Sequence, residues 1–261
     1  LAQTQQVIVA THSPILVGQT QPHTNILVEN STAQMRPSLK RIRRCLGIEL
    51  SDSLASAPIC ILVEGLTDSA IYKTLLCESS TKVRKAFEDA RIIITPTNGT
   101  GKLGREIEIQ RQFLNQILIL LDADAAGREI SQTLQAEHRI DASEFRLIPI
   151  LKRPRHSEVE LEDMFQPDFI ADVLNDKFGN SFTADDFRVV NKKWSFNFKK
   201  AAELSGIPAD AIDPAKTAIS HAVEKRGINA LRDDYRDYID RLAQTLEGML
   251  DGVNEKPPYA Q

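Results

Sequence analysis

The stretch "ILILLDADAAGRE", residues 117–129, runs apolar for five residues and then presents two aspartates, Asp122 and Asp124. The apolar run predicts a buried strand, and the residues after it predict a helix. Side chains two apart in extended backbone project to one side, so both carboxylates can reach one site. Two such carboxylates repel each other unless a cation such as Mg²⁺ lies between them. The alternative is that one aspartate is the N-cap of a helix starting near Ala125 and the other is solvated.

The segments on either side of this stretch alternate between apolar runs and helix-length amphipathic segments. The strands are expected in "ICILVEG", "ARIIITPT", "ILILLDAD" and "FRLIPIL", with helices in "DSAIYKTLLCESS", "REIEIQRQFLNQ" and "GREISQTLQAEHR". Such alternation is typical of βαβ units with a mostly parallel sheet buried on both faces. We therefore predict an α/β core over residues 58–156, a helical C-terminal part over 157–252 and a tail over 253–261.

A second acidic pair follows the first expected strand. In "ILVEGLTD", Glu64 ends the strand, Gly65 permits a close backbone approach, and Asp68 lies one helical turn further on. Ligands of open α/β sheets bind at the carboxyl ends of the strands. Glu64, Asp68, Asp122 and Asp124 are therefore expected to converge on one acidic site.

The bulk composition is that of an ordinary globular protein. Of 261 residues, 42% are hydrophobic and 26% are charged, and the net charge of −4 gives no global attraction to polyanions. Binding of nucleic acid would need a local basic surface or metal ions. Three cysteines without metal-site spacing favour a reducing compartment, so we expect a cytoplasmic protein that does not enter a membrane.

The two acidic motifs carry a family resemblance. "VEGLTD" followed by "DADAAGRE" resembles the Toprim domain of topoisomerases, bacterial primases and certain nucleases, over roughly residues 59–151. The turn "TNGTGKLG" resembles the glycine-rich turn of the nuclease branch; its other interpretation is a loop that needs positive φ at Gly99 or Gly101. The resemblance implies a Rossmann-like, mostly parallel sheet flanked by helices, and chemistry that depends on Mg²⁺ or Mn²⁺.

The N-terminal segment narrows this resemblance. "VIVATHSPILV" is expected to form a buried strand at residues 7–9 and is similar to the last strand and switch histidine of ABC-type ATPases. We interpret residues 1–35 as the end of a truncated ATPase domain and 36–57 as a connecting helix and linker. An ATPase end followed by Toprim resembles the OLD (overcoming lysogenization defect) family of nucleases, which act in phage defence or DNA processing.

The OLD resemblance implies further functional residues and partners. His12 would sense the γ-phosphate of ATP, but only together with the upstream ATPase segments, so this fragment alone should not hydrolyse ATP. DNA would be the substrate, and the ATPase domain would form a homodimer or higher oligomer. The family also allows a helicase-like partner. In "RHSEVELEDMF", Glu160 and Glu162 are the candidate ligands of a second metal ion, and Asp163 could replace either.

The implied reaction is two-metal hydrolysis of DNA phosphodiester bonds. One ion, held by Glu64 with Asp122 or Asp124, would deliver hydroxide, and the other, held by Asp68 with Glu160 and Glu162, would stabilise the leaving oxygen.

The same resemblance places a lysine beyond the acids, where Lys225 would neutralise charge in the transition state. Lys102 competes for this role and is also a candidate DNA contact. Lys192 and Lys193, near Trp194, are further candidate DNA contacts, although a solvated helix face explains them equally well.

Three other functions fit parts of this pattern. A haloacid-dehalogenase-type phosphatase also has DxD after a strand, but it expects threonine where Ala126 stands. A non-catalytic Toprim module, used for assembly or nucleotide sensing by an ATPase, would need no intact acidic site. A topoisomerase would need a tyrosine nucleophile in its own cleavage domain, and such a context is absent around Tyr72, Tyr235, Tyr238 and Tyr259.

Overall fold

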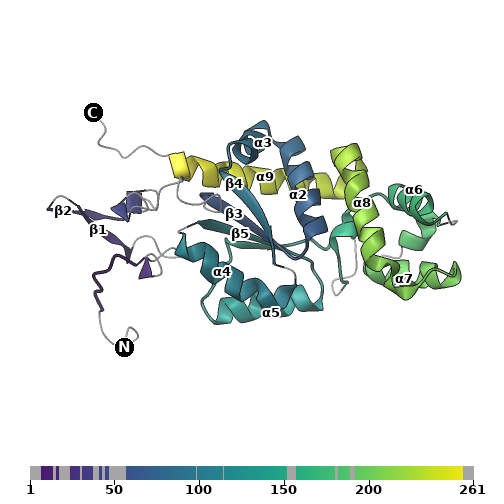
Figure 1. The fold of residues 1–261 in the computed structure, drawn as a ribbon, viewed down its shortest axis with the longest axis horizontal. Coiled ribbons are helices and arrows are strands. Elements are labelled where there is room, and N and C mark those ends of the chain that lie inside the picture. The colour runs from purple at the N-terminus through teal and green to yellow at the C-terminus, as the bar shows by residue number, and fades with distance from the viewer. Residues whose placement is uncertain are drawn as a thin grey trace.

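The fold was analysed in a computed structural model of the chain (Figure 1). The structure describes residues 7–13, 16–17, 24–29, 31–37, 41–42, 45–46, 57–97, 99–113, 115–151, 157–179, 182–188 and 192–254. Most of the expected linker and the end of the expected C-terminal tail lie outside these residues.

A parallel sheet of four strands forms the centre of the molecule. Its order is β4-β3-β5-β6, so β4 and β5 flank β3 on opposite sides. The strands are β3 (Ile59–Val63), β4 (Ile92–Pro96), β5 (Gln116–Leu121) and β6 (Phe145–Leu147). All four strands expected from the sequence are present, which confirms the predicted α/β class with a parallel sheet.

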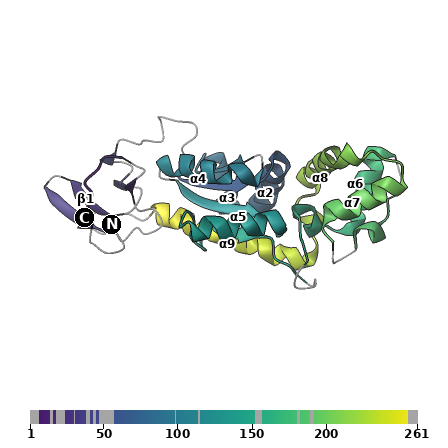
Figure 2. The same cartoon turned by 90° about the horizontal axis from the view of Figure 1, so that it is seen from below.

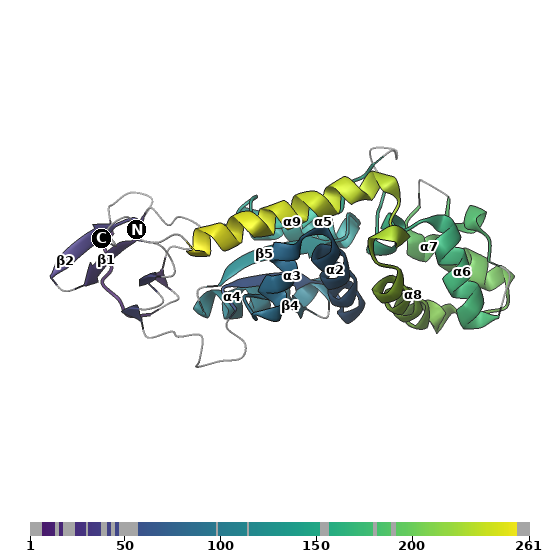
Figure 3. The ribbon, with the colours of Figure 1, turned by 90° about the horizontal axis from the view of Figure 1, so that it is seen from above.

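Helices cover both faces of this sheet (Figures 1 and 3). One face carries α4 (Leu103–Gln112) and α5 (Ala125–Ala136); the other carries α2 (Leu66–Ser79), α3 (Thr81–Glu88) and α9 (Asp233–Asn254). Alternate residues of β3 serve the two layers: Ile59, Ile61 and Val63 pack towards α2 and α9, whereas Cys60 and Leu62 pack towards α4. The strand is apolar throughout because both of its faces are buried.

The expected strand at residues 7–9 is not present. Val7, Ile8 and Val9 are exposed and have no strand partner among the described residues. A strand is stable only when neighbouring strands satisfy its backbone groups, and the described part of the chain offers none here. The N-terminal region instead contains an antiparallel hairpin of β1 (Ile26–Glu29) and β2 (Thr32–Met35). Of the expected connecting helix, Arg41, Ile42 and Cys45 are helical.

The C-terminal helices form a lobe at the end of the sheet opposite the hairpin (Figures 1 and 2). Its elements are η4 (Leu161–Met164), α6 (Pro167–Phe178), η5 (Ala184–Phe187), α7 (Trp194–Leu204), η6 (Ala209–Ala211) and α8 (Ile212–Arg226). Trp194 and Phe198 stack in its core, with ring centroids 5.3 Å apart.

The last helix, α9, belongs to the sheet rather than to this lobe. After η7 (Gly227–Ala230) the chain returns, and α9 packs on α2 and α3. The helical part expected over 157–252 is therefore divided between the lobe and the sheet layers. Within the described residues, no helix combines the length and apolarity needed to cross a membrane.

Candidate functional site

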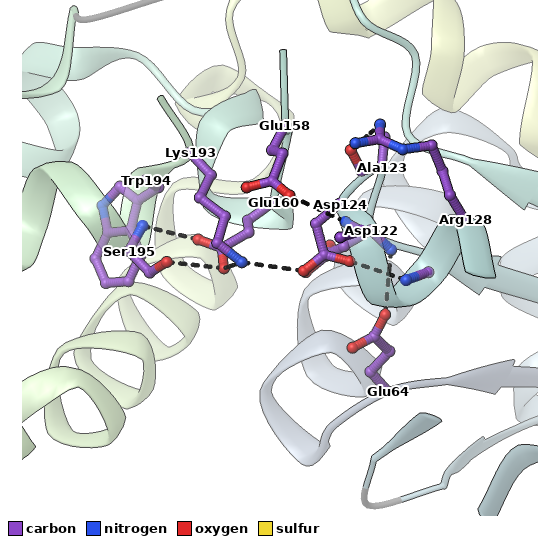
Figure 4. Close-up of polar contacts among 12 residues, drawn as sticks. Glu64, Asp122, Ala123, Asp124, Arg128, Glu158, Glu160, Lys193, Trp194 and Ser195 are labelled. Carbon is purple, nitrogen blue, oxygen red and sulfur yellow. Dashed lines mark hydrogen bonds and ion pairs between the residues drawn. The ribbon is translucent and has the colours of Figure 1, made fainter. Parts of the chain in front are cut away.

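The site lies where the strand order of the sheet reverses. Glu64 follows β3 and Asp122 follows β5, and these adjacent parallel strands end at the same edge. The strand that follows β3 in the chain, β4, lies on one side of β3, and β5 lies on its other side. The order of the strands in the sheet therefore reverses direction between β3 and β5. Crevices of this kind are where open α/β sheets bind ligands. The backbone N–H of Asp122 donates to Oε1 of Glu64 at 3.3 Å, which joins the two strand ends (Figure 4).

Asp68 is brought to the same edge by the start of α2. Gly65 is the N-cap of this helix, and its N–H donates to Oδ2 of Asp68 at 3.0 Å. The hydroxyl of Thr67 donates to the other carboxylate oxygen of Asp68 at 3.2 Å. The negative charge is favoured here because the N-terminal N–H groups of a helix lack intrahelical acceptors.

The two aspartates of DxD have different surroundings. Asp124 is the N-cap of α5 and accepts a hydrogen bond from the N–H of Gly127 at 2.9 Å. Asp122 is only partly exposed, and its Oδ1 accepts from the N–H of Leu161 at 3.0 Å. Between them, Ala123 forms an antiparallel bridge with Val159. The N-cap alternative is thus correct for Asp124, whereas Asp122 faces the acidic site.

The acids after the sheet, Glu160, Glu162 and Asp163, also differ in their surroundings. Glu160 accepts from the N–H and the hydroxyl of Ser195 at 2.7 and 2.9 Å (Figure 4). Asp163 accepts from the N–H of Trp194 at 3.0 Å. Glu160 and Asp163 therefore cap the N-terminus of α7. Glu162 does not: its side chain is buried, and neither carboxylate oxygen accepts a hydrogen bond in the described part of the chain.

Two lysines from the helical lobe face these acids. Lys193 Nζ lies 3.0 Å from Asp124 and 3.2 Å from Glu160, and Lys216 Nζ lies 3.2 Å from Oε2 of Glu162. Burial acts to lower the pKa of each ammonium, but the neighbouring carboxylates outweigh it and raise both. The charge of Lys216 also opposes the rise in the pKa of Asp122 and of Glu64.

Lys225, the lysine expected at the site, lies elsewhere. It follows Lys216 by nine residues of α8, which is about 13.5 Å along the axis and roughly half a turn around it. Its exposed side chain lines a separate depression between α6 and α8. The expectation that Lys225 faces the acids is therefore wrong. Helical phase could have indicated Lys216, because it shares the buried face of Ser220 and Val223 at spacings of four and seven.

Burial, together with mutual repulsion, raises the pKa of the central carboxyls. Burial and the charges of Asp124 and Asp68 raise the pKa of Glu64 to about 7, although the backbone N–H of Asp122 opposes the shift. Burial, then Glu64 and Glu162, raise the pKa of Asp122 well above its ordinary value. Burial also raises the pKa of Glu162 to about 7, although Lys216 opposes it.

The second aspartate of DxD behaves in the opposite way. Burial acts to raise the pKa of Asp124, but hydrogen bonds from Gly127 and Lys193 outweigh it and lower the pKa. The negative charge of Asp124 is therefore already balanced by the protein.

Four of these acids have the ligand chemistry that a hard cation prefers. Glu64, Asp68, Asp122 and Glu162 supply oxygen ligands only, their charges repel one another, and Glu162 has two buried oxygens without a hydrogen bond. Asp124 and Glu160 fit a second cation poorly, because Lys193 and backbone donors already satisfy them. In the described ranges, no three Asp, Glu, His or Cys side chains are arranged as a preformed metal coordination sphere.

The remaining candidate residues lie on the surface. His12 is exposed, as are Lys102 in η3 (Thr100–Lys102) and Lys192 before α7. Gly99, in the glycine-rich turn, has a φ of 106°, so the turn needs glycine there.

The tyrosines are not placed as nucleophiles. Tyr72, Tyr235 and Tyr238 are buried, and Tyr259 lies outside the described residues.

Comparison with known proteins gave no match, neither to a protein-family model nor to a curated protein.

Proposed function

We propose that the chain is the nuclease part of an OLD-type protein, a metal-dependent endonuclease that hydrolyses DNA phosphodiester bonds on a Toprim fold. One observation carries the proposal: Glu64 and Asp122 meet at the switch point of a parallel sheet, beside the buried carboxylate of Glu162, which pairs with Lys216 and accepts no hydrogen bond among the described residues. Burying several carboxylates together is costly unless cations balance them. One lysine beside Glu162 leaves negative charge in this group that a divalent cation would balance.

The residues of the site would share the work as follows. Glu64, Asp68, Asp122 and Glu162 would hold Mg²⁺ or Mn²⁺. Such an ion, when bound, lowers the pKa of water and neutralises phosphate charge. Lys216, beside Glu162, would take the role that the OLD resemblance implies for Lys225: its ammonium would stabilise negative charge on the phosphate oxygens.

Lys193 bears on both expected metal ions, because Asp124 is an expected alternative ligand of the first ion and Glu160 an expected ligand of the second. Asp124 and Glu160 are both in contact with its ammonium at 3.0 and 3.2 Å. The lysine therefore contributes the positive charge that a second ion would bring. Two-metal catalysis requires Lys193 to move away from these carboxylates.

The wider setting of the nuclease is part of the same proposal. The chain would follow an ABC-type ATPase domain in a cytoplasmic protein of phage defence or DNA processing. That domain would bind ATP near His12, form a homodimer or higher oligomer, and allow a helicase-like partner. The exposed position of His12 leaves it free to contact a nucleotide held by other parts of such an assembly.

A non-catalytic Toprim module is the second candidate. It is favoured by the ion pairs of Asp124, Glu160 and Glu162 with lysines, because a site balanced by the protein itself can persist without metal. The two candidates differ in whether divalent cations bind at the acids and support cleavage.

The test uses variants that remove charge without removing volume. Supercoiled plasmid is incubated with Mg²⁺, Mn²⁺, Ca²⁺ or EDTA and the wild type, Asp122→Asn, Glu64→Gln, or the exposed control Asp172→Asn. We expect nicking or linearisation that requires Mg²⁺ or Mn²⁺, persists in the control and disappears in the two site variants. Because Asp122→Asn relieves repulsion, its thermal unfolding temperature should equal or exceed that of wild type.

Two outcomes contradict the nuclease proposal. Cleavage that survives in both site variants would assign the activity to other residues or to a contaminant. A folded wild type that neither cleaves DNA nor binds Mn²⁺ by isothermal titration calorimetry would leave the non-catalytic module as the function.

A further inference from the structure

The outer face of α7 combines one exposed aromatic ring with exposed lysines. Phe196 is 49% exposed, whereas the neighbouring Trp194 is 2% exposed and belongs to the core. Lys199 and Lys200 follow Phe196 at spacings of three and four, so the three side chains share one helical face. We define Lys192, Phe196, Lys199 and Lys200 as the α7 surface. The aromatic residue available to a ligand is thus Phe196 and not the tryptophan.

The charge of this surface is opposite to that of the whole chain. The net charge is −4, yet residues 192–204 contain four lysines and one glutamate. Lys192 Nζ lies over the ring of Phe196, 4.9 Å from its centroid. Bases stack on such rings, and lysines beside the ring contact the backbone phosphates. A polyanion with flat apolar groups fits this surface better than a protein partner does.

The α7 surface is continuous with the acidic site. Lys193, between Lys192 and the helix, contacts Asp124 and Glu160, and Phe196 follows it by three residues, about 4.5 Å of rise. A strand whose phosphate lies at the acids can therefore place a nearby base on Phe196. Only an unpaired base offers its face to a protein ring, since the bases of a duplex are stacked on one another.

We infer that the α7 surface binds a single-stranded segment of the DNA substrate, with one base stacked on Phe196 and phosphates held by Lys199 and Lys200. This inference rests on the proposed nuclease function and names its substrate class. The enzyme would act on single-stranded DNA, or on duplexes with an unpaired segment, within a few nucleotides of the stacked base.

The binding test uses the full chain in EDTA, so that no cleavage occurs. Fluorescence anisotropy compares a labelled strand of about 12 nucleotides with a hairpin duplex of the same sequence. Phe196→Leu keeps an apolar side chain without the ring, Phe196→Tyr keeps the ring, and Leu204→Ala removes an exposed apolar side chain at the other end of α7.

The expected result separates base stacking on Phe196 from nonspecific binding of DNA to an apolar surface. Phe196→Leu should weaken single-strand binding by about tenfold, whereas Phe196→Tyr and Leu204→Ala stay within about twofold of wild type. Duplex binding should change little in all three. Replacing Lys199 and Lys200 together by alanine should reduce the slope of log affinity against log salt by about 1.4.

A second readout reports the stacking itself. A 2-aminopurine base in the strand should lose fluorescence on binding wild type and keep it on binding Phe196→Leu. Single-strand affinity and quenching that are unchanged in Phe196→Leu would overturn the inference, as would equal losses for strand and duplex. If Asp122→Asn still abolishes metal-dependent nicking in that case, the nuclease proposal stands while this inference fails. Binding that depends on Phe196 without any cleavage would instead contradict the nuclease proposal.

Discussion

Glu162 should make the metal-free protein less stable as the pH rises. Its side chain is 1% exposed, and burial raises its pKa from about 4.5 to about 7. A carboxyl whose folded pKa exceeds its unfolded pKa binds its proton more tightly in the folded state. The folded protein therefore holds more protons between these two values, and the free energy of unfolding falls as the pH passes through them.

The size of the effect follows from the two pKa values. At about 1.36 kcal/mol per pKa unit, the difference between 4.5 and about 7 corresponds to about 3.4 kcal/mol. Roughly 2.5 kcal/mol of this loss falls between pH 5 and pH 8.5, because the unfolded carboxyl is already largely ionised at pH 5. Glu64 adds to the loss in the same direction, since its pKa is also raised to about 7.

Urea unfolding in EDTA, followed by the fluorescence of Trp194, measures this loss at several pH values. In Glu162→Gln the decline should be smaller than in wild type by roughly 2.5 kcal/mol, because the amide does not ionise. The exposed control Glu129→Gln should follow wild type. If the free energy of unfolding falls equally with pH in wild type and Glu162→Gln, the argument from burial and repulsion is refuted. This outcome does not depend on the function of the protein.

Three further predictions test the rest of the site. Lys216→Met should abolish metal-dependent plasmid nicking and Lys225→Met should leave it unchanged, because only the first ammonium faces the acids. Gly127→Ala should lower the free energy of unfolding by about 1–3 kcal/mol in urea titrations, since its Cβ would collide with the carbonyl oxygen of Asp122, whereas Gly101→Ala, in open space, should not lower it. Calorimetric titration with Mn²⁺ in two buffers should show more proton release near pH 6.5 than near pH 8.5, because the site carboxyls hold protons at the lower pH.

The sheet and the meeting of Glu64 with Asp122 could be predicted because both depend on local patterns. Apolar runs separated by amphipathic segments indicate parallel strands, and parallel strands end at one edge. The positions of the acids relative to those ends were therefore fixed by the sequence pattern. The different surroundings of Asp122 and Asp124 were not, because they depend on the bridge between Ala123 and Val159, two segments joined through β6.

The lysines that face the acids could not be predicted from the sequence in the same way. The sequence around a lysine on a surface helix does not show which residues its side chain will contact in the folded protein. Lys216 and Lys225 lie on the same helix and differ only in helical phase. Helical phase places Lys216 on the buried face of α8, but what this face meets depends on the packing of α8 against α2 and α6, which is a tertiary contact. The same holds for α9, whose apolar face would suit the lobe as well as α2 and α3.

The residues of the site come from two parts of the fold. Glu64, Asp68 and Asp122 belong to the sheet edge, whereas Glu162 and the two lysines, Lys193 and Lys216, belong to the helical lobe. Docking of the lobe offsets carboxylate repulsion in the metal-free protein. Under the proposed function, a divalent cation entering the site would compete with those same ammonium groups, so its affinity would depend on how firmly the lobe holds them there. The contacts that stabilise the metal-free protein would therefore be the contacts that limit how tightly it binds metal.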